Sequence, residues 1–185
     1  MRIIAGKRRG ASLSAPEGLD VRPTLARVRE SLFNVLDGGR FGSPYRNQLV
    51  IDAFAGSGAL GLEALSRGGA RAVFLENAIQ PRRALHRNIR TLGFNEQATV
   101  IESDATKLRR AAPETAGLIL MDPPYGSGLA APCLQALKFY GWSSPSTLVV
   151  LELAAKEQTS MPDWLAAVDV RCYGRTKLVF LQITD

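Results

Sequence analysis

The stretch LVIDAFAGSGALGLEAL, Leu49–Leu65, decides how the rest of the chain is interpreted. An apolar run is followed by the pattern G-x-G-x-x-G at Gly56, Gly58 and Gly61, which opens a helical pattern. The acidic Glu76 follows about twenty residues later, the spacing at which dinucleotide-binding turns carry an acid. A glycine-rich turn between a strand and a helix predicts a Rossmann-like fold, and taken literally it favours NAD.

From this stretch onward, strand-like and helix-like segments alternate. The expected strands are Leu49–Phe54, Ala72–Glu76, Thr99–Glu102, Leu118–Met121 and Thr147–Leu153. The expected helices lie between them, at Ala59–Ser66, at Ile79–Leu92, near Lys107 and at Leu129–Tyr140. Near-continuous apolar strands that alternate with helices predict a parallel sheet covered by helices on both faces.

The C-terminal segment breaks this alternation. Val168–Tyr173 and Lys177–Ile183 have the pattern of two strands, joined by the tight turn Gly174-Arg175-Thr176. A closing hairpin places an antiparallel strand in an otherwise parallel sheet. NAD domains do not usually end in this way, whereas the methyltransferase variant of the doubly wound fold does.

Length and composition exclude several classes of protein. The chain has 185 residues, enough for one domain of ordinary size. No apolar run approaches the roughly 20 residues of a membrane span, and the N-terminus lacks the apolar segment of a signal peptide, so we expect a cytoplasmic location. A single histidine, His86, and two distant cysteines, Cys133 and Cys172, predict no metal site and buried free thiols.

The formal net charge of +6 favours a polyanionic partner, and the basic residues gather near the N-terminus. We expect an N-terminal extension, residues 1–46, made of a small two-stranded flap and an amphipathic helix, followed by a cofactor-binding domain, residues 47–185. The candidates for contact with RNA are Lys7, Arg8, Arg9, Arg22, Arg27 and Arg29. For the last three, pairing with nearby acids is an equal alternative. The arginines of the helix at Ile79–Leu92 are expected to form a solvated face.

A second motif, Asp122-Pro123-Pro124-Tyr125, follows the fourth expected strand. Ligands of open parallel sheets lie beyond the carboxyl ends of the strands, near the point where the strand order reverses. The first and fourth strands flank that point, so the glycine turn and this motif should face one cleft. Glu76 and Asp104, which follow the second and third strands, could accept hydrogen bonds from ribose hydroxyls and from the exocyclic amine of a nucleoside.

The two motifs together resemble those of S-adenosylmethionine-dependent methyltransferases that act on exocyclic amines of bases. DAFAGSG matches the cofactor loop of these enzymes and DPPY their catalytic tetrapeptide. With MRIIAGKRRG and LDVRPTLARVRESLFNVL before them and YGRTKLVF after them, the whole chain resembles the RsmD family of bacterial 16S rRNA guanine-N2 methyltransferases. NAD is therefore rejected, also because no second domain is present to carry the catalytic residues of a dehydrogenase.

The resemblance implies a class I methyltransferase: a doubly wound, mostly parallel seven-stranded α/β sheet, Rossmann-like, with a C-terminal antiparallel hairpin. It implies S-adenosylmethionine as cofactor, S-adenosylhomocysteine as its product, and 16S rRNA as substrate in an assembled or assembling small subunit. The implied catalytic residues are Asp122, Pro123, Pro124 and Tyr125. The implied cofactor contacts are Asp52, Phe54, Ala55, Gly56, Ser57, Gly58, Glu76, Asp104 and Ala105.

The motifs predict a mechanism but leave the base open. The Asp122 carboxylate and the Pro123 carbonyl could accept the two N–H groups of an exocyclic amine, and Tyr125 could stack on the base. The tetrapeptide alone does not choose among adenine N6, cytosine N4 and guanine N2, or between DNA and RNA. A non-catalytic RNA-binding assembly factor with the same fold is the alternative from a different class.

Overall fold

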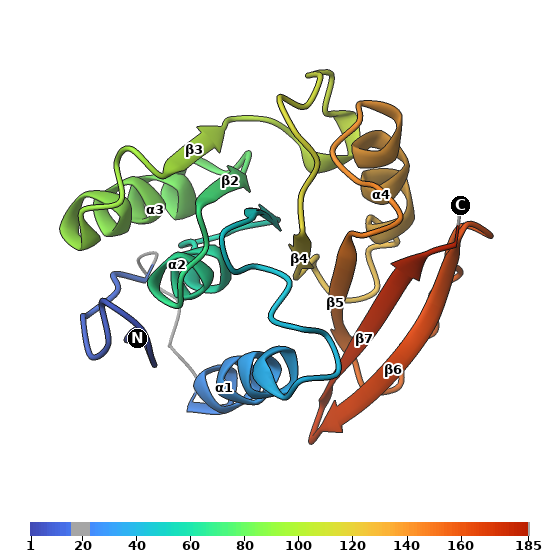
Figure 1. The fold of residues 1–185 in the computed structure, drawn as a ribbon, viewed down its shortest axis with the longest axis horizontal. Helices are drawn as coiled ribbons and strands as arrows, with labels where there is room; N and C mark the ends of the chain where they lie inside the picture. Colours follow the sequence, from blue (N-terminus) through green and yellow to red (C-terminus); the bar gives the residue numbers. More distant parts are fainter. Residues whose placement is uncertain (16–22, 185) are drawn as a thin grey trace.

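A seven-stranded sheet organises the computed structural model of the chain, which describes residues 1–15 and 23–184 (Figure 1). The strand order is β3-β2-β1-β4-β5-β7-β6. The strands are β1 Leu49–Ala53, β2 Arg71–Leu75, β3 Ala98–Ile101, β4 Leu118–Met121, β5 Leu148–Ala154, β6 Leu165–Tyr173 and β7 Thr176–Ile183. The helices are α1 Pro23–Asp37, α2 Ala59–Ser66, α3 Ile79–Leu92, the 3-10 helix η1 Ala105–Lys107 and α4 Ala130–Phe139.

The sheet confirms the predicted doubly wound topology. The strands β1 to β5 pair in parallel, whereas β7 pairs antiparallel with both β5 and β6. The final hairpin is tighter than expected, because Tyr173 pairs with Thr176 and only Gly174 and Arg175 form the turn. Gly174 has a φ of 60°, in the left-handed region that such short turns require.

Helices cover both faces of the sheet. One face packs against α4 and η1 in a core that includes Ile51, Ile119 and Val149. The other face packs against α1 next to β4 and β5, and against α2 and α3 next to β1 and β2. The helices of the second face lie on the N-terminal side of the molecule, opposite α4 (Figure 1). This arrangement leaves the carboxyl ends of the parallel strands uncovered at one edge of the sheet.

The N-terminal segment pairs with itself over a short stretch and is bonded to α2. The two arms of the segment are joined by an antiparallel bridge between Arg2 and Ser12 and by backbone hydrogen bonds from Ile3 to Ala11, from Gly10 to Ile3 and from Leu13 to Met1, at 2.8–2.9 Å. The backbone also bonds to α2, where the N–H groups of Ile4 and Ala5 donate to the buried Glu63 carboxylate at 2.8 and 2.9 Å. At Gly6 a Cβ would lie 1.9 Å from the Ser66 carbonyl oxygen, so the close approach to α2 requires glycine.

Residues 1–46 also share a core with the rest of the chain. Ile3 and Leu13 are buried in one cluster with Leu62, Phe74 and Leu85. The helix α1 likewise buries apolar side chains against β4 and β5. The N-terminal part is therefore packed onto the sheet domain, and the boundary after residue 46 stays a prediction.

Two expectations from composition concern exposure. Within the described residues, no helix is both long and apolar enough to span a membrane. Cys133 is buried in the core, as predicted, whereas Cys172 is exposed. The prediction was wrong for Cys172 because β6 is an edge strand with few buried positions.

Gly61 provides a test of how the glycine turn packs. A Cβ at this position would lie 2.5 Å from Phe74 Cε1 and 3.1 Å from Asp52 Cβ. We expect Gly61→Ala to lower the free energy of unfolding by about 1–3 kcal/mol, the range observed for overpacked cores. The measurement is urea denaturation. Helix propensity alone predicts the opposite, a gain of up to about 1 kcal/mol, and such a gain would contradict this packing.

Candidate active site

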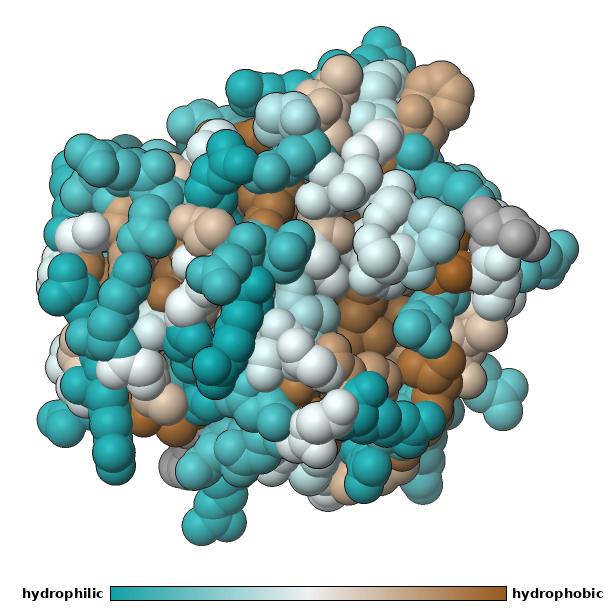
Figure 2. Space-filling model, viewed as in Figure 1, coloured by the Kyte–Doolittle hydropathy of each residue, from teal (hydrophilic) through white to brown (hydrophobic). Residues whose placement is uncertain are grey.

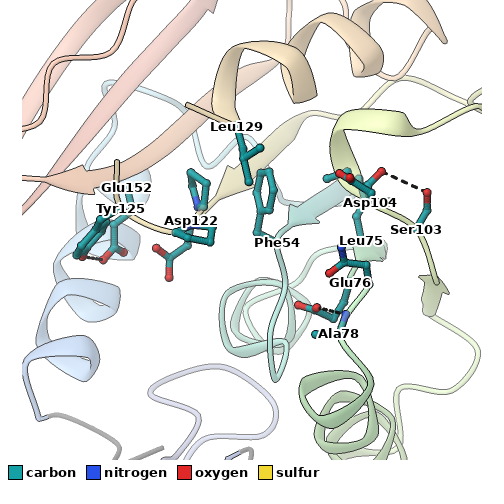
Figure 3. Close-up of a pocket in the computed structure, with 14 residues that line it drawn as sticks. Phe54, Leu75, Glu76, Ala78, Ser103, Asp104, Asp122, Tyr125, Leu129 and Glu152 are labelled. Carbon is teal, nitrogen blue, oxygen red and sulfur yellow. Dashed lines mark hydrogen bonds between the residues drawn. The ribbon is translucent and has the colours of Figure 1, made fainter. Parts of the chain in front are cut away.

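A cavity of about 550 Å³ lies at the carboxyl ends of the parallel strands (Figure 3). Its lining combines acidic, apolar and aromatic side chains from the ends of β1, β2, β4 and β5 and from the loop after β3: Phe54, Leu75, Glu76, Asn77, Ala78, Ser103, Asp104, Ala105, Asp122, Pro123, Pro124, Tyr125, Leu129 and Glu152. Phe54 lies in the middle, with Glu76 and Asp104 on one side and Asp122 and Tyr125 on the other. The cavity therefore has two halves with different chemistry.

The first half presents acids beside the glycine turn. Glu76 is buried, and its carboxylate accepts hydrogen bonds from the N–H groups of Gly56 and Ala78, both at 2.7 Å. Asp104 accepts from the N–H and the hydroxyl of Thr106 at 2.9 and 2.7 Å. These hydrogen bonds lower the pKa of Asp104, so it is ionised at neutral pH. A carboxylate offers two oxygens with two acceptor sites each, so both acids keep capacity for a ligand.

The turn after β1 is held in an uncommon backbone conformation. Phe54 has a φ of 63°, which is rare for a bulky side chain and costs conformational energy. The Ala55 N–H donates to the Leu75 carbonyl at 3.0 Å, and the Gly58 N–H donates to the Ala55 carbonyl at 2.7 Å. Together with the bond from Gly56 to Glu76, these contacts fix the turn against β2 and place the Phe54 ring in the cavity.

The three glycines of the motif have different surroundings. At Gly58 a Cβ would collide with Leu85 Cδ1 at 2.4 Å, and at Gly61 with the Phe74 ring. These two glycines permit the close packing of the turn and α2 against β2 and α3. At Gly56 a Cβ would meet nothing within 4 Å, so its backbone faces open space. Gly56 is thus the position at which a ligand could approach the backbone.

Asp52 is placed differently from the prediction. The sequence suggests that it approaches the cofactor, but the side chain is buried behind the turn and does not line the cavity. Its Oδ2 accepts a hydrogen bond from the Gly61 N–H at 2.8 Å, which satisfies a donor in the first turn of α2. Burial raises the pKa of Asp52 to about 8, and the nearby Asp122 and Glu76 carboxylates add to the rise. In this structure Asp52 supports the turn.

The second half of the cavity holds Asp122, Tyr125 and a residue that the sequence interpretation missed, Glu152. The Tyr125 hydroxyl donates to Glu152 Oε1 at 3.2 Å and lies 3.3 Å from Thr176 Oγ1. The Tyr125 residue is 52% exposed, so its ring is open to a partner. Asp122 is open to the cavity, whereas Glu152 is buried. Glu152 could have been noticed as the charged residue within the apolar strand LVVLELA.

The two carboxyl groups of this half disfavour each other's charge. Burial raises the pKa of Glu152, and the Asp122 carboxylate raises it further, while the Tyr125 hydrogen bond opposes the rise. The dense protein surroundings also raise the pKa of Asp122, although solvent in the open cavity works against that effect. The pair therefore holds a proton to higher pH than ordinary carboxyl groups do, with Glu152 the more strongly affected member.

The predicted RNA contacts are scattered. Lys7, Arg8 and Arg9 are exposed on the N-terminal segment. The Lys7 ammonium lies 4.9 Å from the centre of the Phe94 ring, and Arg8 Nε donates to the Leu92 carbonyl. Figure 2 shows a predominantly hydrophilic surface over this segment and α3. Arg27 is exposed on α1. Arg22 lies outside the described residues.

For Arg29, the structure supports the alternative of pairing with an acid and not the RNA contact. The side chain is 4% exposed, donates to the Arg2 carbonyl and lies 3.8 Å from the Glu63 carboxylate. A guanidinium that is buried against a carboxylate in the core has no surface to offer to a phosphate. The spacing of Arg29 with Phe33 and Leu36 already places it on the buried face of α1. Arg29 therefore fastens the N-terminal segment to α1 and α2.

No group of three or more histidine, cysteine or acidic side chains within residues 1–15 and 23–184 is arranged to hold a metal ion.

The carboxyl pair predicts a pH-dependent stability. An acid whose pKa is raised by folding binds more protons in the folded chain, so the free energy of unfolding falls as pH rises through the raised pKa. We expect Glu152→Gln to raise the free energy of unfolding at about pH 8 by 1–3 kcal/mol, with a smaller difference at about pH 5. Urea denaturation at both pH values measures this. The exposed Glu96 provides the matched control, Glu96→Gln, and an equal effect of both variants would show that the burial of Glu152 beside Asp122 does not raise its pKa.

Comparison with known proteins assigns the family. The family model described as "Conserved hypothetical protein 95" matches residues 1–182. Ribosomal RNA small subunit methyltransferase D of Escherichia coli (strain K12) is 36% identical over 152 residues, which span 82% of this chain and 74% of that protein. The protein of the same name from Haemophilus influenzae is 36% identical over 168 residues, 88% of this chain and 83% of that protein.

A solved structure agrees with the sequence comparison. The structure of yhhF from Escherichia coli has a TM-score of 0.83 and 33% identity, and the match covers 99% of this chain and 97% of that chain. Family model, relatives and structure thus coincide over the described sheet and the N-terminal segment. The chain belongs to the family of ribosomal RNA small subunit methyltransferase D, the RsmD family.

Proposed function

We propose that this chain transfers a methyl group from S-adenosylmethionine to the exocyclic N2 amine of a guanine in small-subunit 16S ribosomal RNA. The observation that carries the proposal is that one cavity is lined by Phe54 at the start of the glycine turn, by Glu76, which binds the Gly56 N–H, and by the Asp122–Tyr125 motif. Membership of a family whose relatives are named ribosomal RNA methyltransferases supports methyl transfer to rRNA. The choice of guanine N2 rests on the resemblance of the sequence to that family.

The first half of the cavity fits S-adenosylmethionine. Glu76 would accept hydrogen bonds from the ribose hydroxyls, and Asp104 with Ala105 would contact the adenine. The backbone at Gly56, where a Cβ would meet open space, would lie against the methionine portion. When bound, this cofactor supplies a methyl group on a positively charged sulfur. The acids that line this half complement that charge.

The second half of the cavity fits a base that has left its helix or loop. The Tyr125 ring is exposed for stacking, which is worth about 1–3 kcal/mol per base and offsets part of the cost of extracting the base. The Asp122 carboxylate and the Pro123 carbonyl would each accept one N–H of the exocyclic amine. This orients the nitrogen lone pair toward the methyl group, a contribution of position and electrostatics. After transfer, the raised pKa of Asp122 suits it to accept the proton that the amine loses.

The natural substrate is proposed to be rRNA in an assembled or assembling small subunit in the cytoplasm. The exposed Lys7, Arg8 and Arg9 would contact phosphates, since basic side chains supply most of the sequence-independent affinity for nucleic acid. Arg27, which is exposed on α1, and Arg22, which lies outside the described residues, are further proposed contacts.

One assay tests reaction and substrate together. Purified protein and labelled S-adenosylmethionine are given to unmodified 16S rRNA, to small subunits that lack the modification and to duplex DNA, and the nucleosides are identified by mass spectrometry. We expect N2-methylguanosine from rRNA or subunits, and their relative yields show whether assembly matters. Methyladenine or methylcytosine would overturn the assignment of the base. No label with intact cofactor binding would favour a non-catalytic RNA-binding factor.

Asp122 tests the mechanism. We expect Asp122→Ala to lower kcat by about 10²–10³-fold or more, because the amine loses a charged acceptor in the transition state. The dissociation constant of S-adenosylmethionine, measured by calorimetry, should stay nearly unchanged, because Asp122 lies in the half of the cavity assigned to the base. A fully active Asp122→Ala enzyme would remove Asp122 from the mechanism.

The N-terminal basic residues test the RNA surface. Replacing Lys7, Arg8 and Arg9 by glutamine should weaken rRNA binding and flatten its salt dependence, because each lost phosphate contact lowers the slope of log K against log salt by roughly 0.7–0.9. Filter binding at several salt concentrations measures the slope. The matched control replaces the exposed α3 residues Arg83, Arg87 and Arg90. An unchanged slope in the N-terminal variant would contradict the proposed contacts.

A further inference from the structure

Glu152 has no role in the proposed mechanism, although it lies beside Asp122, the residue proposed to bind the reacting amine. It is 7% exposed and occupies the carboxyl end of β5, in a strand whose other residues are apolar. The register pairs Met121 with Leu151, so Asp122 and Glu152 are the next residues on two neighbouring strands. Both line the cavity, and Figure 3 shows Glu152 next to the Tyr125 hydroxyl.

The position is unfavourable for a carboxylate that only supports the fold. Burial and the neighbouring Asp122 both oppose its charge. In the described part of the chain no salt bridge connects Glu152 to a cation, and the hydrogen bond from Tyr125 compensates only in part. A glutamine or leucine would fill the same volume without this cost. The surroundings of Glu152 therefore indicate that its hydrogen-bonding capacity serves a ligand with N–H donors.

The chemistry of the bases identifies that donor. Guanine carries an N1–H next to its N2 amine, so its edge offers neighbouring donors. Adenine and cytosine instead carry an unprotonated ring nitrogen, an acceptor, next to their amine. Burial raises the pKa of Glu152, but hydrogen bonds from N–H donors of a ligand favour the ionised carboxylate. The ionised form accepts hydrogen bonds only, so it attracts the guanine edge and repels the other two. If Asp122 binds the amine, an acceptor for the ring N–H is needed beside it. The end of the neighbouring strand β5, where Glu152 lies, is that position.

We propose that Glu152 determines the specificity for guanine by accepting a hydrogen bond from the N1–H of the target base. This inference rests on the proposed function and deepens it. Asp122 binds the amine that reacts, Glu152 reads the neighbouring ring nitrogen, and Tyr125 stacks on the base while its hydroxyl holds the Glu152 carboxylate. Sites built to hydrogen-bond an N–H reject analogues that lack it, because a buried acceptor is then left unpaired.

The test compares guanine with 2-aminopurine, which keeps the 2-amino group but presents an acceptor at N1. After the target guanine has been mapped in the nucleoside assay, small-subunit rRNA is ligated from fragments with either base at that position and, where assembly is required, reconstituted into subunits. Wild type, Glu152→Gln and the surface control Glu96→Gln are compared by kcat/KM for both substrates and by the dissociation constant of S-adenosylmethionine.

We expect wild type and Glu96→Gln to prefer guanine over 2-aminopurine by about a hundredfold or more. Enzyme sites whose buried groups hydrogen-bond an N–H of the substrate discriminate at least this strongly against analogues that lack it. Glu152→Gln should lose at least about tenfold in kcat/KM on guanine and much less on 2-aminopurine, with cofactor affinity unchanged. An equal loss on both substrates, or no loss, would overturn the role of Glu152 while leaving the proposed function intact. A wild-type enzyme that forms no N2-methylguanosine would overturn the proposed function itself and this inference with it.

Discussion

The parallel pairing of β1 with β4 is the constraint on which the site depends. The register joins Val50 with Leu118 and ends with Ala53 beside Met121, so the next residues, Phe54 and Asp122, leave the sheet side by side. The glycine turn and the DPPY motif are far apart in sequence, and this pairing alone brings them to one edge. The adjacent pairing of β4 with β5 then sets Glu152 beside Asp122. The cavity is thus a consequence of strand order and register.

Buried carboxyl groups connect the fold to the site. Glu63 on α2 binds the backbone of the N-terminal segment and lies near Arg29 of α1, so it joins three parts of the chain. Asp52 holds the start of α2 behind the glycine turn, and Glu76 holds the turn from the cavity side. These acids stabilise structure because backbone donors satisfy them. Asp122 and Glu152 lack such donors in the contacts described above, which is the expected condition of groups that act on a ligand.

The sequence allowed accurate prediction where a local pattern has one structural solution. The apolar runs gave the strands to within a residue or two in most cases, and the alternation with helices gave the doubly wound topology. Asp122, Glu76 and Asp104 were predicted as site residues because they follow strands at the same edge of a parallel sheet, and all three line the cavity. Their roles toward cofactor and base remain proposals.

The features that the sequence did not predict depend on contacts between residues that are distant in the chain. For Arg29 the sequence left RNA contact and pairing with an acid as equal alternatives, and it did not identify the partner, Glu63, because that residue lies on another helix. The attachment of the N-terminal segment to α2 was not predicted, because the close approach of Gly6 to the Ser66 carbonyl joins residues far apart in sequence. Glu152 was overlooked because one acid in an apolar strand gains meaning only through the register that sets it beside Asp122.

The most direct measurement of the central claim is a crystal structure of the chain with S-adenosylhomocysteine and an RNA fragment that carries the target guanine. The account predicts the ribose on Glu76, the adenine near Asp104, and the guanine stacked on Tyr125 with its amine at Asp122 and the sulfur on the same side of Phe54 as Glu76. A cofactor bound away from the glycine turn, or a guanine whose amine points away from Asp122, would contradict it.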